Sequence, residues 1–411
     1  MAQPEVLVVG GGPGGSAAAH WLAREGHEVL LVEKKAYPRE KTCGDGLTPR
    51  SIHQLLEMGF DFSVPEFHRC TGLRAYSGGL MLELEWPEHS VYPNWGGVIR
   101  RLDLDVQVAA LAEKQGVAIR PNTEARPVIE SGALEAVDLI AGGEVERVTP
   151  QVVVVADGSL SRFGRALGTR RDRSRPYGLA ARGYFSSPRS GDGHLESHLD
   201  LRGPDGATIP GYGWIFPLGD GTVNVGVGVL STFHRWKDVN TSTLMDALVA
   251  AAPPSWEITP ESSLGDPKGG KLPMSFSVGP KAGPNWVVVG DAAGAINPFN
   301  GEGIAYAYET GRIAARHVHA ALAAGDRSLL HAYPQELEDV YGLYYRVSRA
   351  FVRAIGRPGV MRTLTSVGLR SRPLMEWVLR VMANLIDPAE RTAGEVAYRM
   401  IERAVQAGPE P

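Results

Sequence analysis

This chain of 411 residues has few cysteines, no long apolar run and little net charge. Its two cysteines, Cys43 and Cys70, cannot build the disulfide framework of a secreted protein, so we expect a reducing compartment. No apolar run reaches the roughly eighteen residues of a membrane-spanning helix, and strand-like sequence starts too early for a signal peptide. The net charge of −4 argues against nucleic acid as a partner. The eleven histidines lack metal-ligand spacing, so we predict no metal.

Glycine, by contrast, is abundant, and its most informative cluster is the sequence VLVVGGGPGGS at residues 6–16. The pattern predicts a strand, a tight turn, a helix over 17–24 and a second strand that ends at Glu33. Gly10 permits the turn, Gly12 lets backbone N–H groups approach a pyrophosphate, and Gly15 lets the helix pack closely on the strand. The Glu33 carboxylate can accept hydrogen bonds from an adenosine ribose. The cluster therefore predicts a dinucleotide site, with a purely structural glycine turn as the alternative.

A second motif, VVVGDAAG at residues 287–294 followed by NPFNGEGI at 297–304, identifies the dinucleotide. Asp291 can accept hydrogen bonds from a polyol chain. A helix expected over 303–324 can direct its N–H groups at the pyrimidine end of a flavin, where its dipole stabilises negative charge on the reduced ring. Nicotinamide cofactors have no ribitol, so the motif predicts FAD. A helix cap at Asp291 is the alternative, but this residue lies too far ahead of the helix.

The order of these patterns predicts an α/β fold with interleaved domains. A Rossmann-like FAD-binding domain is expected to form from three segments, residues 1–70, 99–168 and 285–328. The remaining chain is expected to form a β-rich substrate domain (71–98 and 169–284) and a C-terminal helical region (329–411).

These motifs, together with Asp157-Gly158, resemble the FAD-dependent group that contains aromatic hydroxylases, flavin halogenases and geranylgeranyl reductases. Within that group, PREKTCGDG at 38–46 and PGYGWIFP at 210–217 resemble the geranylgeranyl reductase family. The likeness is closest to the bacterial menaquinone reductase branch, on CGDGLTPR at 43–50 and NPFNGEGI at 297–304. Members of that branch saturate one isoprene double bond in the tail of the quinone.

The resemblance implies FAD contacts at Gly10, Gly12, Pro13, Gly14, Gly15, Glu33, Cys43, Gly44, Gly46, Arg101, Ala125, Asp157, Asp291, Pro298, Gly301, Gly303 and Ile304. A guanidinium at Arg101 suits a pyrophosphate because it can donate two parallel hydrogen bonds. A salt bridge with Asp105 is the alternative. Gly164 stands where the hydroxylases carry an arginine after Asp-Gly-x-x-Ser, which argues against their NADPH contact. The electron donor, NAD(P)H or a small redox protein, stays open.

The implied reaction is difficult because nothing polarises an isolated double bond. Tyr212, Trp214 and Phe216 alternate along an expected strand and so share one of its faces. We expect this face to line an apolar slot above the flavin and to stabilise carbocation character; an aromatic core cluster is the alternative. Cys43, Asp45 and Tyr212 are the candidate proton donors, Asp45 through a raised pKa.

Residues 346–386 carry many arginines and one acidic residue, Glu376. Between them stand Trp, Phe, Leu and Met side chains. This composition is typical of helices that lie on an anionic membrane surface; a solvated basic face is the alternative. We therefore expect a cytoplasmic enzyme, peripheral on the inner face of the cell membrane, that reduces an isoprenoid lipid or quinone.

Other functions fit parts of the pattern. Geranylgeranyl diphosphate or a geranylgeranylated lipid is an alternative substrate within the family. An oxygen-using hydroxylase or halogenase is an alternative of another class, although halogenases carry Trp-x-Trp-x-Ile-Pro where this chain has Tyr-x-Trp-x-Phe-Pro at 212–217. A non-catalytic FAD-binding module is the third.

Overall fold

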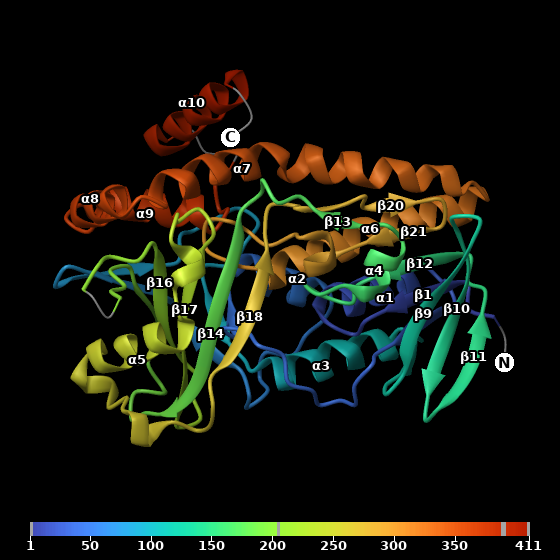
Figure 1. Cartoon of the computed structure of the whole chain (residues 1–411), viewed down its shortest axis with the longest axis horizontal. Coiled ribbons are helices and arrows are strands. Elements are labelled where there is room, and N and C mark those ends of the chain that lie inside the picture. Colours follow the sequence, from blue (N-terminus) through green and yellow to red (C-terminus); the bar gives the residue numbers. More distant parts are fainter. Residues whose placement is uncertain (1–2, 204–205, 388–391, 409–411) are drawn as a thin grey trace.

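A computed structural model provides the structure of the chain and describes residues 3–203, 206–387 and 392–408. Two large sheets lie along the long axis, and the helix α7 (Tyr333–Ile355) runs across the top of the molecule (Figure 1). The helical region predicted over 329–411 includes residues 388–391 and 409–411, which lie outside the described residues.

The first sheet has six strands in the order β20-β21-β12-β1-β2-β8, parallel except for β20. Its members come from distant parts of the chain: β1 (Val6–Val9), β2 (Val29–Val32), β8 (Ala118–Arg120), β12 (Val152–Val155), β20 (Ala282–Gly283) and β21 (Trp286–Val288). The valine-rich strands are buried on both faces, as parallel sheets require. The Rossmann-type α/β fold is thus confirmed.

Helix α1 (Pro13–Arg24) packs against α3 (Arg101–Lys114) and α6 (Ile304–Ala324). The prediction that the first helix begins at residue 17 was wrong, because Pro13 at the first helical position fixes a helical φ and the glycines after it follow. A Cβ atom on Gly311 of α6 would lie 2.5 Å from the Gly14 carbonyl oxygen. The two helix backbones therefore touch at this glycine.

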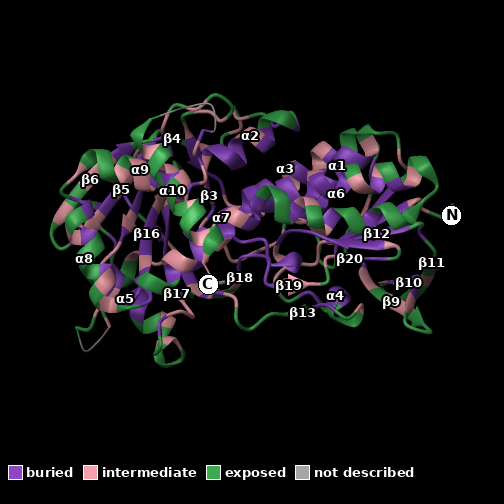
Figure 2. Ribbon diagram, turned by 90° about the horizontal axis from the view of Figure 1, so that it is seen from above, coloured by how far each residue is buried: buried purple, intermediate pink, exposed green. Residues whose placement is uncertain are grey.

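An antiparallel sheet that the sequence patterns did not predict packs beside the first sheet (Figure 2). Its strands are β9 (Glu124–Glu130), β10 (Ala133–Ala141) and β11 (Glu144–Val148). Both connections turn at glycines with positive φ, Gly132 in one and Gly142 and Gly143 in the other. Side chains such as Val137 and Leu139 complete the core of the first sheet.

The second large sheet has seven strands in the order β18-β14-β17-β16-β15-β5-β6. They are β5 (Gly72–Ser77), β6 (Leu80–Glu85), β14 (Tyr177–Ser186), β15 (His194–His198), β16 (Gly211–Pro217), β17 (Thr222–Leu230) and β18 (Lys268–Pro273). Helix α5 (Thr241–Ala251) covers one face, where Ile215 and its neighbours form an apolar core. A Cβ atom on Gly213 would lie 2.8 Å from Leu248 of α5. The odd-numbered positions of β16 therefore face α5, and the even-numbered positions face away from it.

Shorter elements join the two large sheets: β3 (Gly46–Leu47), α2 (Pro49–Glu57), β4 (His68–Cys70), β7 (Gly96–Val98), α4 (Arg162–Ala166), β13 (Arg170–Arg171) and β19 (Val278–Gly279). The C-terminal helices are α7, α8 (Pro358–Gly368), α9 (Arg372–Met382) and α10 (Ala393–Ala407). Pro358 and Pro373 occupy the first turns of α8 and α9, where a residue without an N–H is tolerated, and so separate the three helices. No helix in the part of the chain that the structure describes is both long and apolar enough to cross a bilayer.

Replacement of Gly311 by alanine is expected to lower the free energy of unfolding by about 1–3 kcal/mol, because the new methyl group forces α1 and α6 apart. The matched control is Gly359→Ala in α8, where a Cβ atom would meet nothing within 4 Å. That change is expected to be neutral or slightly stabilising, since alanine is the better helix former. Denaturant unfolding of both variants measures the difference, and equal stabilities would contradict the close contact.

Candidate active site

The turn between β1 and α1 forms a site for an anion. Helix α1 begins after Gly12 without a side-chain cap, so its first N–H groups are free for a ligand. A Cβ atom on Gly12 would meet only two guanidinium nitrogens, that of Arg39 at 3.5 Å and that of Arg101 at 3.8 Å. Helix N-terminus and guanidinium groups therefore surround one small space.

Asp105 orients both guanidinium groups. Arg101 donates two hydrogen bonds to the Asp105 carboxylate, from Nε at 2.7 Å and from Nη2 at 2.8 Å. Arg39 Nη1 lies 3.1 Å from the same carboxylate and its Nε lies 3.1 Å from Glu33 Oε2. The salt bridge considered as the alternative role of Arg101 is present, and it holds the guanidinium beside the turn where a pyrophosphate contact was predicted.

Glu33 stands at the end of β2, where its carboxylate accepts a hydrogen bond of 3.0 Å from the Gly11 N–H. The Thr123 N–H donates to the Glu33 carbonyl oxygen, which brings Ala125 of β9 close to this end of the sheet. Asp157, after β12, accepts a hydrogen bond from the Phe163 N–H on one oxygen, while its other oxygen is buried without a partner. These predicted contacts gather at the carboxyl ends of parallel strands.

The second motif lies at the start of α6. One Asp291 oxygen would be 3.3 Å from a Cβ atom on Gly303, and the other lies 3.8 Å from Lys41 Nζ. Gly303 is the N-cap and supplies no side chain, so the N–H groups that follow at Ile304 are available. Pro298 and Gly301 form the preceding turn, in which Gly301 has a φ of +76°. Carboxylate and helix start thus lie together as predicted, although the contacts themselves stay predictions.

The predicted aromatic row lies against the loop at residues 43–46. Ring centroids are 5.8 Å apart for Tyr212 and Trp214 and 6.1 Å apart for Trp214 and Phe216. A Cβ atom on Gly44 would lie 3.4 Å from both the Trp214 and the Phe216 rings. The three side chains therefore share the face of β16 that points toward this loop.

Asp45, in the same loop, is fully buried between the two sheets and has a φ of +64°. Its Oδ1 accepts a hydrogen bond from the Arg101 N–H at 3.1 Å. Its Oδ2 accepts from the Tyr184 hydroxyl at 2.7 Å and from Asn224 Nδ2 at 2.8 Å. Burial raises the pKa of Asp45, and these three donors oppose that rise.

Cys43 is the other candidate of this loop. Its carbonyl oxygen accepts hydrogen bonds from Asn224 Nδ2 at 3.0 Å and from Arg182 Nε at 3.2 Å. Burial raises the pKa of the Cys43 thiol, which keeps it protonated at neutral pH. Strands β14 and β17 thus fix the backbone of the loop.

Sequence reasoning assigned no role to six residues that hold the site together: Arg39, Lys41, Arg182, Tyr184, Asn224 and Glu302. Arg39 and Lys41 belong to the 38–46 motif, which was the available signal. The partners on β14 and β17 follow from strand register, since Phe216 pairs with Asn224 and Asn224 pairs with Tyr184. That register is not visible in a single sequence.

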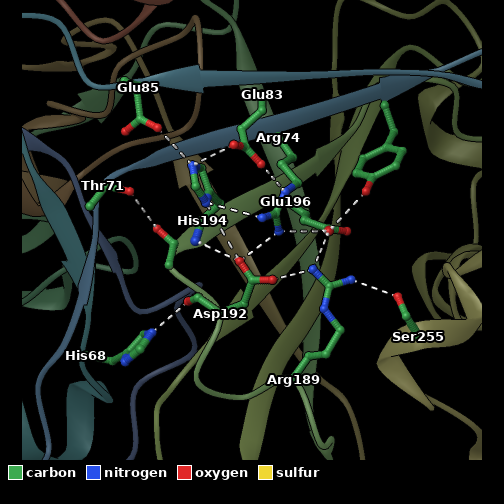
Figure 3. A network of polar contacts seen from close by, with 12 residues as sticks. His68, Thr71, Arg74, Glu83, Glu85, Arg189, Asp192, His194, Glu196 and Ser255 are labelled. Carbon is green, nitrogen blue, oxygen red and sulfur yellow. Dashed lines mark hydrogen bonds and ion pairs between the residues drawn. The ribbon is translucent and has the colours of Figure 1, made fainter.

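A cluster on the outer sheet edge holds ligand atoms of Glu83, Glu85 and His194 within 4.8 Å of one another. Figure 3 shows that a guanidinium group shares this space. Arg74 donates to Glu83 at 2.8 Å and to Asp192 at 2.7 Å, and its Nη2 lies 3.3 Å from His194 Nδ1. Arg74 is paired with Glu83 and Asp192, and His194 lies within ion-pair distance of Glu83 and Glu85, so the cluster is an ion-pair network. The absence of a metal stays a prediction.

Comparison with known proteins agrees with this geometry. A family model described as an FAD binding domain matches residues 3–181. A menaquinone reductase of Mycobacterium tuberculosis is 40% identical over 94% of this chain and 92% of its own length. The chain belongs to the family of FAD-dependent reductases that includes this protein. FAD is the cofactor of the present chain. The glycine turn, the guanidinium groups and the Asp291 motif of this chain suit FAD.

More distant relatives of the reductase share its fold. A digeranylgeranylglycerophospholipid reductase of Methanocella arvoryzae is 29% identical over 82% of this chain and 83% of its own length. Among solved structures, a geranylgeranyl bacteriochlorophyll reductase-like protein of Thermoplasma acidophilum matches with a TM-score of 0.77 and 22% identity, covering 98% of both chains.

Replacement of Gly12 by alanine is expected to weaken FAD binding at least tenfold, about 1.4 kcal/mol, because the methyl group fills the space that the phosphates need. Stability without FAD is expected to stay unchanged, since the nearest protein atoms would be 3.5 and 3.8 Å away. Fluorescence titration with FAD measures the affinity, and Gly191→Ala, in open space, is the control. An unchanged affinity for Gly12→Ala would place the phosphates elsewhere.

Proposed function

We propose that this reductase saturates one carbon–carbon double bond in the isoprenoid tail of menaquinone. The observation that carries the proposal is the aromatic row of β16 lying over the loop at 43–46, in a chain that is 40% identical to a menaquinone reductase over nearly its whole length. Reduced FAD supplies the hydride, and the protein supplies an apolar site and a proton.

An apolar cluster adjoins one end of the aromatic row and supports a polyprenyl substrate. Phe216, at one end of the aromatic row, packs against an apolar cluster of Cys70, Leu84, Trp86, Val98, Leu195, Leu218, Leu379, Ala383 and Leu385. An alkene acquires carbocation character when hydride and proton arrive unequally, and the negative faces of aromatic rings stabilise such charge. Trp214, whose Nε1 donates to Asn224 Oδ1 at 2.9 Å, has a fixed ring orientation for this role.

The candidate proton donors differ in their hydrogen bonds. The Tyr212 hydroxyl donates to the Asn300 carbonyl oxygen at 2.6 Å, and burial raises its pKa. The Cys43 thiol stays neutral, and Asp45 accepts three hydrogen bonds. The sequence motifs make each of the three a candidate that no observation tests, and Trp214 is proposed as the aromatic stabiliser.

Anaerobic reoxidation tests this function. Photoreduced enzyme is expected to return to the oxidised flavin spectrum on addition of menaquinone with an unsaturated tail. After the quinone ring has been reoxidised in air, mass spectrometry is expected to find two added hydrogen atoms in the tail. Faster reoxidation by geranylgeranyl diphosphate or by a geranylgeranylated lipid would assign that compound as the substrate instead of menaquinone. Product formation only with oxygen, by hydroxylation or halogenation, would reject a reductase.

Trp214→Ala is expected to keep its FAD and to lose lipid-dependent reoxidation by roughly a hundredfold, because a misplaced substrate alone costs about that much. Trp214→Phe, which keeps an aromatic face, is expected to lose less. Full activity in Trp214→Ala would show that the aromatic row only packs the core and has no role in the reaction. The same assay with NAD(P)H or a reduced redox protein in place of light identifies the electron donor.

The C-terminal helices support a peripheral position on an anionic membrane, which we also propose. Leu364 and Val367 of α8 and Leu374 of α9 are 49%, 55% and 40% exposed. The exposed Arg362 and Arg370 stand beside them in the sequence. Apolar side chains with neighbouring arginines suit the boundary between acyl chains and anionic headgroups. The inner face of the cell membrane, where quinones are within reach, is the proposed location.

The double variant Leu364→Glu/Val367→Glu is expected to lower partitioning onto anionic vesicles at least tenfold, because it removes apolar contact and adds negative charge. Cosedimentation with vesicles measures this loss. Val145→Glu, at an equally exposed valine of β11, is the matched control and is expected to bind as before. Equal binding of all three proteins, or none to anionic vesicles, would reject the surface.

A further inference from the structure

The carboxyl group of Glu302 lies where three segments of the candidate site meet. Its Oε1 accepts hydrogen bonds from the hydroxyl groups of Thr48 and Ser51, which directly follow the loop at 43–46. Its N–H donates to Asn300 Oδ1, and the Asn300 carbonyl oxygen accepts the hydroxyl of Tyr212. Glu302 is thus connected to the loop, to the start of α6 and to the aromatic row.

The two oxygens of this carboxyl group have different surroundings. Oε1 has two donors, whereas Oε2 is buried without any hydrogen-bond partner. A buried charged oxygen without a donor is unfavourable, and a proton on Oε2 removes the charge. Burial raises the pKa of Glu302 to about 7, so the neutral acid is well populated at neutral pH.

The neighbouring charges do not offset this burial. Arg50 favours the carboxylate, but its guanidinium is already paired with Glu309 at 2.8 Å, and the charge of Glu309 acts in the opposite sense. The other titratable groups that interact with Glu302 are neutral phenols, those of Tyr92, Tyr212 and Tyr306.

We propose that Glu302 is the acid that protonates the substrate alkene, an inference that rests on the function proposed above. Reduced FAD, when bound, would supply a hydride to one alkene carbon and so give up two electrons. The other carbon takes the proton from Glu302 Oε2; the alkene π electrons form that new bond, and the O–H electron pair stays on the carboxylate. Solvent then returns a proton to Glu302.

This assignment separates the two carboxyl groups nearest the aromatic row, those of Asp45 and Glu302, by role. Both oxygens of Asp45 accept hydrogen bonds that fix the loop, so Asp45 is a positioning residue. Glu302 alone of the two has an oxygen free to carry and release a proton.

Glu302→Gln keeps the size of the side chain and removes the acid. The variant is expected to keep its FAD absorbance and circular dichroism, while lipid-dependent reoxidation slows about a hundredfold or more. The rate for the unaltered enzyme is expected to fall as pH rises through about 7, whereas the residual rate of Glu302→Gln stays flat across that range. Wild-type rates and an unchanged pH profile in Glu302→Gln would overturn the proposal.

Ser51→Ala provides a graded test, because it removes one donor that stabilises the carboxylate. The midpoint of the pH profile is expected to move upward while the rate at low pH is kept. A merely structural Glu302 would leave the midpoint in place. A pH profile that Asp45→Asn flattens and Glu302→Gln preserves would assign the proton to Asp45 instead.

Infrared spectroscopy separates this inference from the function itself. Without lipid, the enzyme is expected to show the carbonyl stretch of a protonated carboxylic acid near neutral pH, lost in Glu302→Gln. Absence of that band overturns the role of Glu302 even if menaquinone is reduced. Failure of every isoprenoid lipid to reoxidise the unaltered enzyme overturns the proposed function, and the proton-donor role with it.

Discussion

The buried carboxylate of Asp45 is the interaction on which the arrangement of the site depends. It accepts a backbone N–H from the start of α3 and side-chain donors from β14 and β17, so it joins helix α3 to the second large sheet. A carboxylate taken from water without such donors would destabilise the fold, and three donors offset that cost. The same bonds fix the loop at 43–46 under the aromatic row. The distance between flavin domain and substrate face is therefore set by hydrogen bonds rather than by a flexible linker.

Ion pairs also fix the side chains beside the turn between β1 and α1. Arg39 and Arg101 share Asp105, and Arg39 also meets Glu33, so two cations and two anions are balanced before any ligand is present. Pairing lowers the cost of burying the guanidinium groups and removes most of their rotamer freedom. We propose that the phosphates of FAD meet these donors, which are already oriented, together with the partial positive charge of the α1 terminus. Affinity gained in this way needs little rearrangement of the protein.

The sequence predicts features that depend on residues close together in the chain, and it does not predict contacts between distant residues. Gly10, Gly12 and Gly15 act within one turn, and the alternation of Tyr212, Trp214 and Phe216 is a property of one strand, so both were readable. The sheet β9–β11 was missed because its strands carry charged residues on their exposed faces, which weakens the apolar pattern, although Gly142-Gly143 between β10 and β11 is a two-residue hairpin signal. The partners of Asp45 depend on strand register across residues far apart in the chain, which no local pattern encodes.

The contrast between Asp45 and Glu302 shows why a list of acidic residues near a cofactor does not identify a proton donor. Asp45 is wholly buried and Glu302 buries its Oε2, and burial raises the pKa of both carboxyl groups. Their difference lies in how many lone pairs receive a donor: three hydrogen bonds reach both oxygens of Asp45, and two reach a single oxygen of Glu302. The first pattern favours an anion that organises a loop. The second favours a neutral acid, and alkene reduction in a site poor in water needs a neutral acid whose proton is not already donated.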